Sequence, residues 1–195
     1  MNNMKILIIN TGGNISSLIN ILNFCGYEAK VYEKHSDLKN HDIFFLPGIG
    51  SFDNSIKTLK DQNIYEDLKN LNTIKNKKII GICVGMQILF NKSEEGSLEG
   101  LSLIRGNIKK FKDLHMGWNE IYSHENNVQS DENLFYFAHN YYVDCDKNFI
   151  HSYCKHSIEF PAIIKKDNIY GIQFHPEKSH TNGISLFKKI LNDSF

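Results

Sequence analysis

The sequence predicts an α/β fold in which helices cover both faces of a mostly parallel sheet, with an antiparallel extension in the C-terminal half. Three observations predict this fold. Through the first 90 residues, short apolar runs typical of buried strands alternate with helical stripes, and glycine-rich turns separate them. Parallel neighbours require crossover connections, so these helices would cover the sheet. Beyond about residue 100, strand candidates follow one another closely, as antiparallel strands do.

In the N-terminal half, we expect strands at residues 4–9, 28–33, 41–47 and 77–83 and helices over about 15–25 and 53–70. The first strand is the apolar run MKILII, which ends in the glycine turn NTGGN. Ile15, Leu18 and Leu22 then recur at helical spacing, and Gly26 is a typical stop. The turn PGIGSF separates the third strand from the second helix, which is polar and only intermittently apolar.

In the C-terminal half, six closely spaced segments have the composition of strands, at residues 102–111, 117–123, 134–144, 149–155, 161–167 and 168–174. The stretch KKDNIYG is typical of a hairpin turn. The final segment carries Ile184, Phe187 and Leu191 at helical spacing, which predicts a helix docked on the sheet. Because no repeat, low-complexity tract or linker interrupts the chain, we expect residues 1–195 to form a single domain.

Composition and charge narrow the class of protein. The 195 residues are 41% hydrophobic, as in ordinary globular domains. The 22 basic and 22 acidic residues balance, and Arg105 is the single arginine, so we expect neither nucleic acid nor a membrane as a partner. The apolar run ILII is far too short to cross a membrane or to form a signal peptide. We therefore expect a cytoplasmic protein with reduced thiols, since its four cysteines lack C-x-x-C spacing.

Cys83 lies between two glycines in GICVG, where a buried strand changes into a helical pattern. A nucleophile at such a turn needs a sharp bend, and Gly81 and Gly85 would allow it without a Cβ clash. The helix N-terminus would favour the thiolate, and the amide of Val84 would face an oxyanion. A lone cysteine is more often a small buried hydrophobic residue, so this pattern alone leaves both interpretations open.

A second segment, YGIQFHPEKS at residues 170–179, supplies the groups that a cysteine nucleophile needs. His175 and Glu177 lie two apart in an extended, proline-interrupted segment, so their side chains can project to the same side. Cysteine, histidine and a carboxylate together provide a nucleophile, an acid/base and an orienting group. Taken alone, each residue is better explained in an ordinary way, as a solvated histidine and as a surface glutamate at a strand end.

These segments resemble the triad class of glutamine amidotransferases. GICVGMQ and QFHPEKS carry the similarity, with LPGIGSF before them and HMGWN between them, over nearly the whole chain and in the same order. Met86, the pair Lys178 and Ser179, and HMGWN favour the HisH family, the glutaminase subunits of imidazole glycerol phosphate synthase. The resemblance implies a glutamine amidotransferase domain with a flavodoxin-like sheet, and it implies no cofactor and no metal.

The resemblance implies hydrolysis of L-glutamine to glutamate and ammonia. By that resemblance, Cys83 attacks the side-chain amide, His175 moves the proton between thiol and leaving ammonia, and Glu177 orients the imidazole. A second oxyanion donor is expected from the PGIG loop. The residues expected to hold glutamine or its oxyanion are Gly48, Ile49, Gly50, Val84, Gln87, Asn140 and Tyr141. Relatives usually have serine in place of Asn140.

Release of ammonia implies a partner. In neutral water ammonia is mostly protonated and cannot attack an acceptor, so it must travel along a sheltered path. The resemblance implies a heterodimer with a (β/α)₈-barrel cyclase subunit, HisF, which uses ammonia to close an imidazole ring. Trp118, Asn119, Tyr136 and Lys178 resemble residues at that interface and at the ammonia gate. A core tryptophan with a turn asparagine, a strand tyrosine and a solvated lysine would explain them as well.

Two departures from the family pattern leave the partner open. NTGGN is one residue shorter than the usual first loop, and Leu114 replaces a proline before HMGWN; we expect both toward the sheet edge and the partner-facing surface. One alternative is therefore a related glutaminase subunit that supplies ammonia to a surface-polysaccharide sugar amidotransferase. A stand-alone cysteine hydrolase is a second. A metal-binding protein that uses Cys145, Cys154 and His156 is a third, although its cysteine spacing is wrong for a zinc site.

Overall fold

The structure is a computed structural model that describes residues 4–71, 77–123 and 133–192. Within these residues, a ten-stranded sheet has the order β2-β1-β3-β4-β10-β9-β8-β6-β5, and β7 pairs with β6 beside this path. The strands are β1 (Ile6–Ile8), β2 (Ala29–Val31), β3 (Ile43–Gly48), β4 (Lys78–Cys83), β5 (Lys92–Ser93), β6 (Gly106–Tyr122), β7 (Leu134–Cys145), β8 (Ile150–Lys155), β9 (Glu159–Lys166) and β10 (Ile169–Ile172). The helices are α1 (Ile15–Phe24), α2 (Ser36–Asn40), α3 (Phe52–Asp61), α4 (Tyr65–Leu71), α5 (Val84–Gln87) and α6 (His180–Leu191), with the 3₁₀ turns η2 (Lys147–Phe149) and η3 (Pro176–Lys178).

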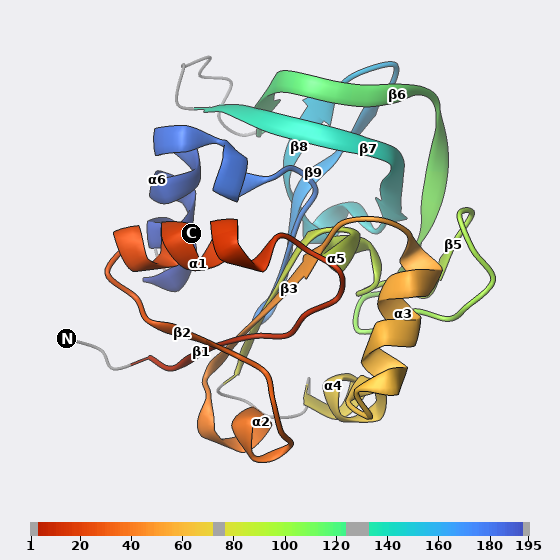
Figure 1. The fold of residues 1–195 in the computed structure, drawn as a ribbon. Coiled ribbons are helices and arrows are strands. Elements are labelled where there is room, and N and C mark those ends of the chain that lie inside the picture. The colour runs from red at the N-terminus through yellow and green to blue at the C-terminus, as the bar shows by residue number, and fades with distance from the viewer. Residues whose placement is uncertain (1–3, 72–76, 124–132, 193–195) are drawn as a thin grey trace.

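The five neighbouring strands β2, β1, β3, β4 and β10 are parallel. Figure 1 shows α1 and α6 on one face of these strands and α3, α4 and α5 on the other. The predicted α/β architecture is confirmed, because helical crossovers join the parallel strands and cover them. β3 and β4 are aligned so that Gly48 lies opposite Cys83, which brings the PGIG and GICVG segments together at one edge of the sheet.

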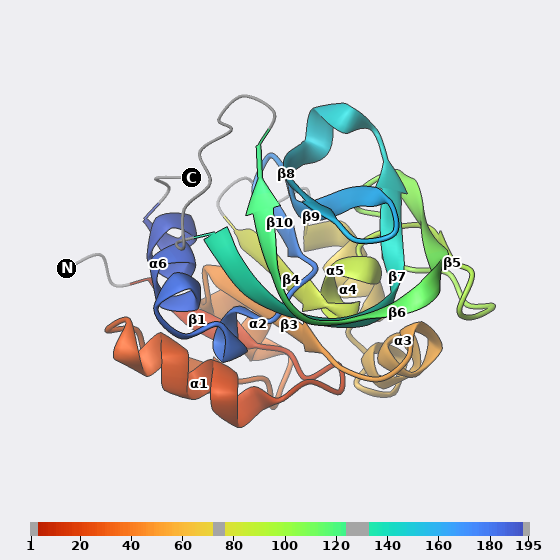
Figure 2. The ribbon, with the colours of Figure 1, turned by 90° about the horizontal axis from the view of Figure 1, so that it is seen from above.

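The antiparallel extension is also confirmed. β9, β8, β6 and β7 each run antiparallel to the strand before them in the sheet, starting from β10. β9 and β10 form the predicted hairpin across Asp167, whose φ is 52°. Figure 2, seen from above, shows β6 and β7 side by side across the top of the molecule. Most of the two strands predicted at residues 102–111 and 117–123 belongs to one long strand, β6, but residues 102–105 precede it and are not in a strand.

The single helix predicted over about residues 53–70 is wrong. α3 ends at Asp61, and α4 begins at Tyr65. Between them Asn63 adopts a φ of 55°, and the side chain of Ile64 is fully buried. A left-handed residue ends the first helix, and the burial of Ile64 in the core places the start of the second. The sequence did not predict the short α2 and β5.

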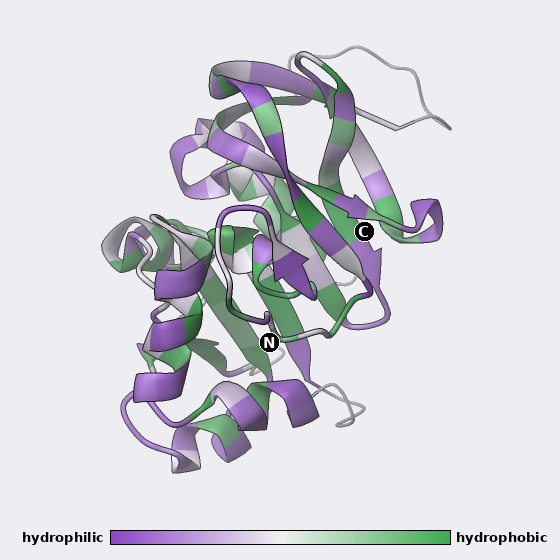
Figure 3. Ribbon diagram, turned by 90° about the vertical axis from the view of Figure 1, so that its right-hand side faces the viewer, coloured by the Kyte–Doolittle hydropathy of each residue, from purple (hydrophilic) through white to green (hydrophobic). Residues whose placement is uncertain are grey.

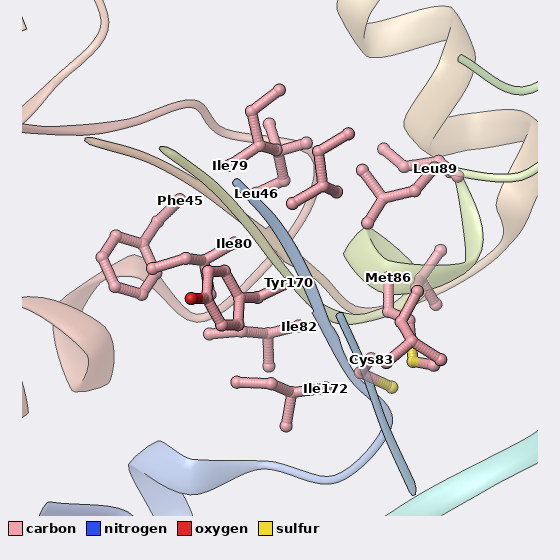
Figure 4. Close-up of a cluster of buried hydrophobic side chains, with 14 of the residues drawn as sticks. Phe45, Leu46, Ile79, Ile80, Ile82, Cys83, Met86, Leu89, Tyr170 and Ile172 are labelled. Carbon is pink, nitrogen blue, oxygen red and sulfur yellow. The ribbon is translucent and has the colours of Figure 1, made fainter. Parts of the chain in front are cut away.

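The core lies between the sheet and its helices. Figure 3 shows hydrophobic residues concentrated on the central strands and hydrophilic residues on the outer parts of the helices. The predicted final helix is confirmed as α6, in which Phe187 and Leu191 are buried and Ile184 packs against the core. Figure 4 shows Cys83 at one end of a cluster of buried side chains on β4 and its neighbours. Across the described part of the chain, the model contains no helix with the length and apolarity that a bilayer crossing requires.

Candidate active site

Cys83 ends β4 at a sharp turn. Its φ and ψ are 54° and −114°, a combination that residues with a side chain rarely adopt. Gly81 and Gly85 serve a steric need: a Cβ on Gly81 would overlap the carbonyl of Gly85, and a Cβ on Gly85 would overlap that of Leu46. The expected bend is therefore present, with its backbone strain on Cys83 itself. The helix that follows is a single turn, so its dipole is smaller than the sequence pattern suggested.

The PGIG loop at the end of β3 packs directly against this turn. A Cβ on Gly48 would approach the side chain of Val84 to 2.9 Å, closer than real Cβ contacts allow. Gly50 has a φ of 101°, which favours glycine, and the side chain of Ile49 between them is 47% exposed. The loop that we expect to donate to an oxyanion thus lies beside Cys83.

The NTGGN loop lies behind the PGIG loop. Thr11 Oγ1 donates a hydrogen bond of 2.7 Å to the carbonyl of Pro47, and Ser55 Oγ donates one of 2.9 Å to the carbonyl of Thr11. NTGGN does not lie beside an outermost strand of the sheet, where we expected it, because β1 lies between β2 and β3; it lies at the carboxyl end of β1, next to the PGIG loop. Thr11 thus links the NTGGN loop directly to the PGIG loop.

Cys83, His175 and Glu177 come together across the end of the sheet. His175 Nδ1 lies 2.8 Å from Glu177 Oε1, and the two side chains are 3% and 6% exposed. Burial alone would lower the pKa of His175, but hydrogen bonds with Cys83 and with Glu177 outweigh it and raise that pKa to about 10. The imidazole is thus charged at neutral pH.

The backbone around His175 is fixed by β7 and by Ser179. The N–H of His175 donates to the carbonyl of Tyr136 at 2.9 Å. Ser179 Oγ donates to the carbonyl of His175 at 2.6 Å and accepts from the N–H of Tyr136 at 3.1 Å. Ser179 is fully enclosed, so this short network holds the imidazole at the end of the sheet. The serine of the HPEKS motif therefore has a structural explanation.

Two buried glutamines lie next to Cys83. Gln173 Nε2 donates to Cys83 Sγ at 4.0 Å, and Gln173 Oε1 accepts from Gln87 Nε2 at 3.3 Å. Gln87 Nε2 also donates to the carbonyl of Tyr141 at 3.3 Å. Gln173 and Gln87 are 0% and 2% exposed. Buried amides hold fixed positions because their hydrogen bonds must be satisfied, so this pair preorganises one wall beside the sulfur.

A pocket of about 310 Å³ opens beside Cys83 and His175. It is lined by Ile49, Gly50, Cys83, Val84, Gln87, Glu95, Leu114, Met116, Ala138, His139, Asn140, Tyr141, His175 and Lys178. Nine of the expected catalytic, glutamine-binding and gate residues are among these. Gly48 of the PGIG loop instead packs against Val84 and Gly85, and Glu177 lies behind His175. A pocket of this size with a few convergent polar groups suits a small polar ligand.

Sequence reasoning missed Glu95 and Gln173. Glu95 lines the pocket, and its Oε2 accepts from the N–H of Phe52 at 2.7 Å, at the start of α3. It lies in a polar stretch whose pattern resembles an ordinary solvated loop, and only the fold brings it to the pocket. Gln173 does have a signal, since it stands two residues before His175 in QFHPEKS, so alternation predicts both side chains on one face.

The residues expected at the partner interface or gate fall into two groups. Trp118, Tyr136 and Lys178 cluster: the Trp118 ring lies 6.0 Å from that of Tyr136, and Lys178 Nζ lies 5.7 Å from the same tyrosine ring. Trp118 also stacks on His180, with ring centroids 5.3 Å apart. Asn119 points away from this cluster, because its Nδ2 donates to the carbonyl of Lys155 at 2.9 Å.

The remaining cysteines do not form a second centre. Burial raises the pKa of Cys145 and that of Cys154 to about 12, which keeps both thiols protonated. Over residues 4–71, 77–123 and 133–192, no group of three or more His, Cys, Asp or Glu residues could hold a metal ion. The metal-binding alternative therefore finds no support in the described residues.

Comparisons with known proteins agree with this geometry. The sequence profile of the family "Glutamine amidotransferase class-I" matches residues 7–193. The chain is 38% identical to "Imidazole glycerol phosphate synthase subunit HisH" of Leptospira borgpetersenii, over 90% of this chain and 93% of that protein. It is 38% identical to "Imidazole glycerol phosphate synthase subunit HisH 2" of Methanococcus maripaludis, over 97% of this chain and 100% of that protein.

Solved structures share the fold. The chain superimposes on "Structure of PurLQS from Thermotoga maritima" with a TM-score of 0.76 and 16% identity, over 98% of this chain and 99% of that one. It superimposes on "Crystal structure of glutamine amidotransferase" with a TM-score of 0.74 and 15% identity, over 95% and 97%. At such identities these likenesses bear on the fold alone.

Proposed function

This chain belongs to the class I glutamine amidotransferases, and we propose that it is the glutaminase subunit of imidazole glycerol phosphate synthase, acting in the cytoplasm. The relatives named above are HisH subunits of that synthase and span nearly the whole chain. The observation that carries the proposed chemistry is the meeting of Cys83, His175 and Glu177 beside the pocket. We propose in addition that residues 1–195 act as one glutamine amidotransferase domain.

In the first half of the reaction, the sulfur of Cys83 attacks the side-chain amide carbon of glutamine. The charged imidazole of His175 then gives its proton to the amide nitrogen. The C–N bond breaks, ammonia leaves, and a thioester joins the acyl group to Cys83. Glu177 keeps the imidazole oriented and balances its charge throughout, which its 2.8 Å hydrogen bond to His175 supports.

In the second half, water replaces ammonia. His175, now neutral, accepts a proton from a water molecule that attacks the thioester carbon. The C–S bond breaks, glutamate departs, and the sulfur of Cys83 recovers its negative charge beside the protonated imidazole. Both tetrahedral intermediates carry an oxyanion, for which we propose the N–H of Val84 and an N–H of the PGIG loop as donors. Removing one such donor typically costs about 2.7–4 kcal/mol of barrier.

Glutamine would be held by polar groups on several walls of the pocket. Gln87 and the backbone of Asn140 and Tyr141 line the pocket and suit the amino-acid end of glutamine, as the family resemblance implies. The carboxylate of Glu95 suits the α-ammonium group, since it is an acidic group that lines the pocket. Asn140 is exposed, and relatives usually have serine at its position. A contact made by the backbone of Asn140 would not depend on this difference in side chain.

The partner we propose is a (β/α)₈-barrel cyclase subunit, HisF-like, that forms a heterodimer with this chain and receives its ammonia. Support comes from the pocket mouth, where Ile49, Leu114 and Met116 line the pocket and are also exposed large apolar residues. Leu114, Met116 and Trp118 alternate along β6, so they share its outer face. Such an apolar rim suits a partner that covers the outlet and keeps ammonia from water.

The alternatives that the sequence left open are not favoured. A surface-polysaccharide glutaminase subunit would use the same triad, but the relatives described above are named as subunits of imidazole glycerol phosphate synthase. A stand-alone cysteine hydrolase would not need an apolar rim at its pocket mouth. It predicts full turnover of glutamine by the chain alone.

The test is glutamate release by the purified chain, alone and with a barrel cyclase subunit. We expect release to rise when the two are mixed and to vanish in Cys83→Ala. Equal hydrolysis by Cys83→Ala would remove Cys83 as nucleophile. Full activity of the chain alone, unchanged by the cyclase subunit, would instead favour the stand-alone hydrolase.

A further inference from the structure

Asn119, His115 and His139 form a chain of polar groups between β6 and the pocket. Asn119 Nδ2 lies 3.2 Å from His115 Nε2, and His115 Nδ1 lies 3.0 Å from His139 Nε2. His139 Nδ1 in turn lies 2.7 Å from the carbonyl oxygen of Tyr141, on the wall of the pocket. His115 and His139 face each other on β6 and β7 and are 4% and 6% exposed. Buried groups of this kind must satisfy their hydrogen bonds within the protein.

A glycine in the HMGWN motif lets this chain form. Asn119 and His115 are four residues apart on β6, and a straight strand would separate their Cα atoms by about 13 Å. Gly117 lies between them with a φ of 122°, a conformation that residues with a Cβ rarely adopt. No atom lies within 4 Å of a Cβ built on Gly117, so its need for glycine is conformational. HMGWN therefore supplies three parts of this chain of polar groups: the donor Asn119, the bend at Gly117 and the imidazole of His115.

The direction of every hydrogen bond in this chain is fixed from its two ends. At the pocket end, the carbonyl of Tyr141 can only accept, so the proton must be on His139 Nδ1. At the other end, the amide nitrogen of Asn119 can only donate, so His115 Nε2 must accept. The Asn119 amide cannot be reversed without loss, because its Oδ1 accepts from the N–H of Glu120 and its Nδ2 donates to Lys155.

It follows that both imidazoles are neutral and protonated on Nδ1. A proton added to His115 would place its Nε2–H against the amide N–H of Asn119, and a proton added to His139 would place its Nε2–H against the Nδ1–H of His115. Either change breaks a hydrogen bond. The charged or titratable groups that face the pair add to this, since His156 stacks on His115 with ring centroids 4.5 Å apart and the charged His175 repels charge on His139. Burial lowers the pKa of His115 to about 4 and that of His139 to about 3.

At the pocket end, this chain of polar groups reaches Tyr141, a residue that lines the pocket. The carbonyl of Tyr141 accepts from His139 and also from Gln87, whose amide reaches toward Gln173 and Cys83. We propose that Asn119, His115 and His139 are a one-directional hydrogen-bond relay of positioning residues that fixes the Tyr141 backbone and Gln87 for glutamine binding, and that couples them to the partner-facing surface of β6.

The coupling to the surface rests on the proposed function, because it assumes a partner on β6. Asn119 directly follows Trp118, whose side chain is 45% exposed and belongs to the cluster expected at the interface. A partner that moves this part of β6 would change the hydrogen bond that His115 accepts from Asn119. Each hydrogen bond farther along the relay would then weaken, down to the carbonyl of Tyr141.

The first test needs neither substrate nor partner. Long-range ¹H–¹⁵N correlation spectra of the isolated chain report which ring nitrogen of each histidine carries a proton. We expect His115 and His139 as neutral Nδ1–H tautomers at pH 7 and still neutral at pH 5.5. An Nε2–H tautomer at either residue, or a charged ring at pH 5.5, would overturn the relay whether or not the chain acts on glutamine.

The second test separates positioning from folding by kinetics of the chain in complex with its cyclase partner. His139→Phe keeps a ring but removes both hydrogen bonds, and we expect the KM for glutamine to rise about five- to tenfold with a fall in kcat below about threefold. His139→Asn keeps a donor at the position of Nδ1, so it should restore most of the KM. Lys112→Gln, an exposed change on the neighbouring strand β6, is the matched control.

The third test reverses the relay at its surface end. Asn119→Asp replaces the donor with an acceptor, so His115 must donate from Nε2. We expect the spectra to show that proton at pH 7 and the KM for glutamine to rise. An unchanged tautomer and KM in Asn119→Asp, or equal KM values for His139→Phe and His139→Asn, would contradict the relay. Absence of any glutamine hydrolysis by the wild-type complex would instead contradict the proposed function and leave the tautomer result as the test.

Discussion

His175 Nδ1 and Glu177 Oε1 lie 2.8 Å apart, and both side chains are almost fully buried. This ion pair, together with the hydrogen bond between His175 and Cys83, lets a buried imidazole remain charged, since burial alone would favour its neutral form. The chain reaches this geometry with only Pro176 between the two residues, at the start of a 3₁₀ turn. The short connection leaves the carboxylate little freedom to move away from the ring.

Replacement of Glu177 by glutamine should therefore impair catalysis more than binding. The amide keeps an oxygen near His175 but removes the charge that balances the imidazolium. We expect kcat for glutamate release by the complex to fall by roughly 10²-fold or more, with a smaller change in KM. The exposed Glu28→Gln is the control. A fall of less than about threefold in kcat would show that Glu177 does not support His175 in the reaction.

The carboxylate of Glu95 should contribute to glutamine affinity. Glu95→Gln keeps an oxygen that can accept from the N–H of Phe52, so the loop should remain in place while the charge is lost. We expect the KM for glutamine to rise about tenfold or more with kcat little changed, as for loss of a charged hydrogen bond. Glu94→Gln is the matched control, because that neighbour pairs with Lys109. Equal KM values in the two variants would exclude Glu95 from substrate binding.

Gly85 and Gly26 should tolerate alanine differently, because Gly85 is needed for space and Gly26 for its backbone conformation. Gly85→Ala would place a Cβ on the carbonyl of Leu46, and the backbone of β3 or of the turn after Cys83 would have to move. We expect it to lower the free energy of unfolding by about 3 kcal/mol or more, measured by urea denaturation. Gly26 has a φ of 87° but open space around it, so Gly26→Ala should cost only about 1–2 kcal/mol. A Gly85→Ala variant as stable as Gly26→Ala would contradict the packing described for the Cys83 turn.

Acid should destabilise the folded chain through His115 and His139. Their pKa values of about 4 and 3 in the folded chain lie below the ordinary histidine value of 6.5. Between these values the unfolded chain binds more protons, so the stabilisation is full above pH 6.5 and is lost as the pH falls toward 4. We expect the free energy of unfolding to fall from pH 6.5 to 4.5, and to fall less steeply in His139→Phe than in the exposed variant His35→Gln. Parallel slopes would show that the two histidines are not held neutral.

The sequence predicted the central strands β1, β3, β4 and β10 well because they are buried on both faces and appear as continuous apolar runs. The end of β4 could be predicted too, since a cysteine between two glycines has few structural explanations once QFHPEKS is present. The break between α3 and α4 could not, because polar residues surround Ile64 and a single buried isoleucine gives no periodic signal.

Side chains that the fold brings to the site from distant segments were the hardest to predict. Glu95 reaches the pocket only because its loop is tied to the start of α3, by its own hydrogen bond and by Asp53, which accepts from the N–H groups of Ser97 and Leu98. The relay through His115 and His139 depends on the pairing of β6 with β7, which places the two histidines opposite each other. Both strands are far in sequence from Cys83 and the PGIG loop. Local patterns carry no information on such pairings.

Trp118 should contribute strongly to association with the cyclase partner. Its ring is held by His180 and lies beside Tyr136, so an aromatic surface is already ordered before a partner arrives. We expect Trp118→Ala to raise the Kd of the complex about tenfold or more, measured by calorimetric titration, because truncated aromatic anchors commonly cost this much. Phe24→Ala is the matched control, since that ring is 73% exposed at the end of α1. Circular dichroism of both variants would verify the fold, and an unchanged Kd for a folded Trp118→Ala would place the interface elsewhere on the chain.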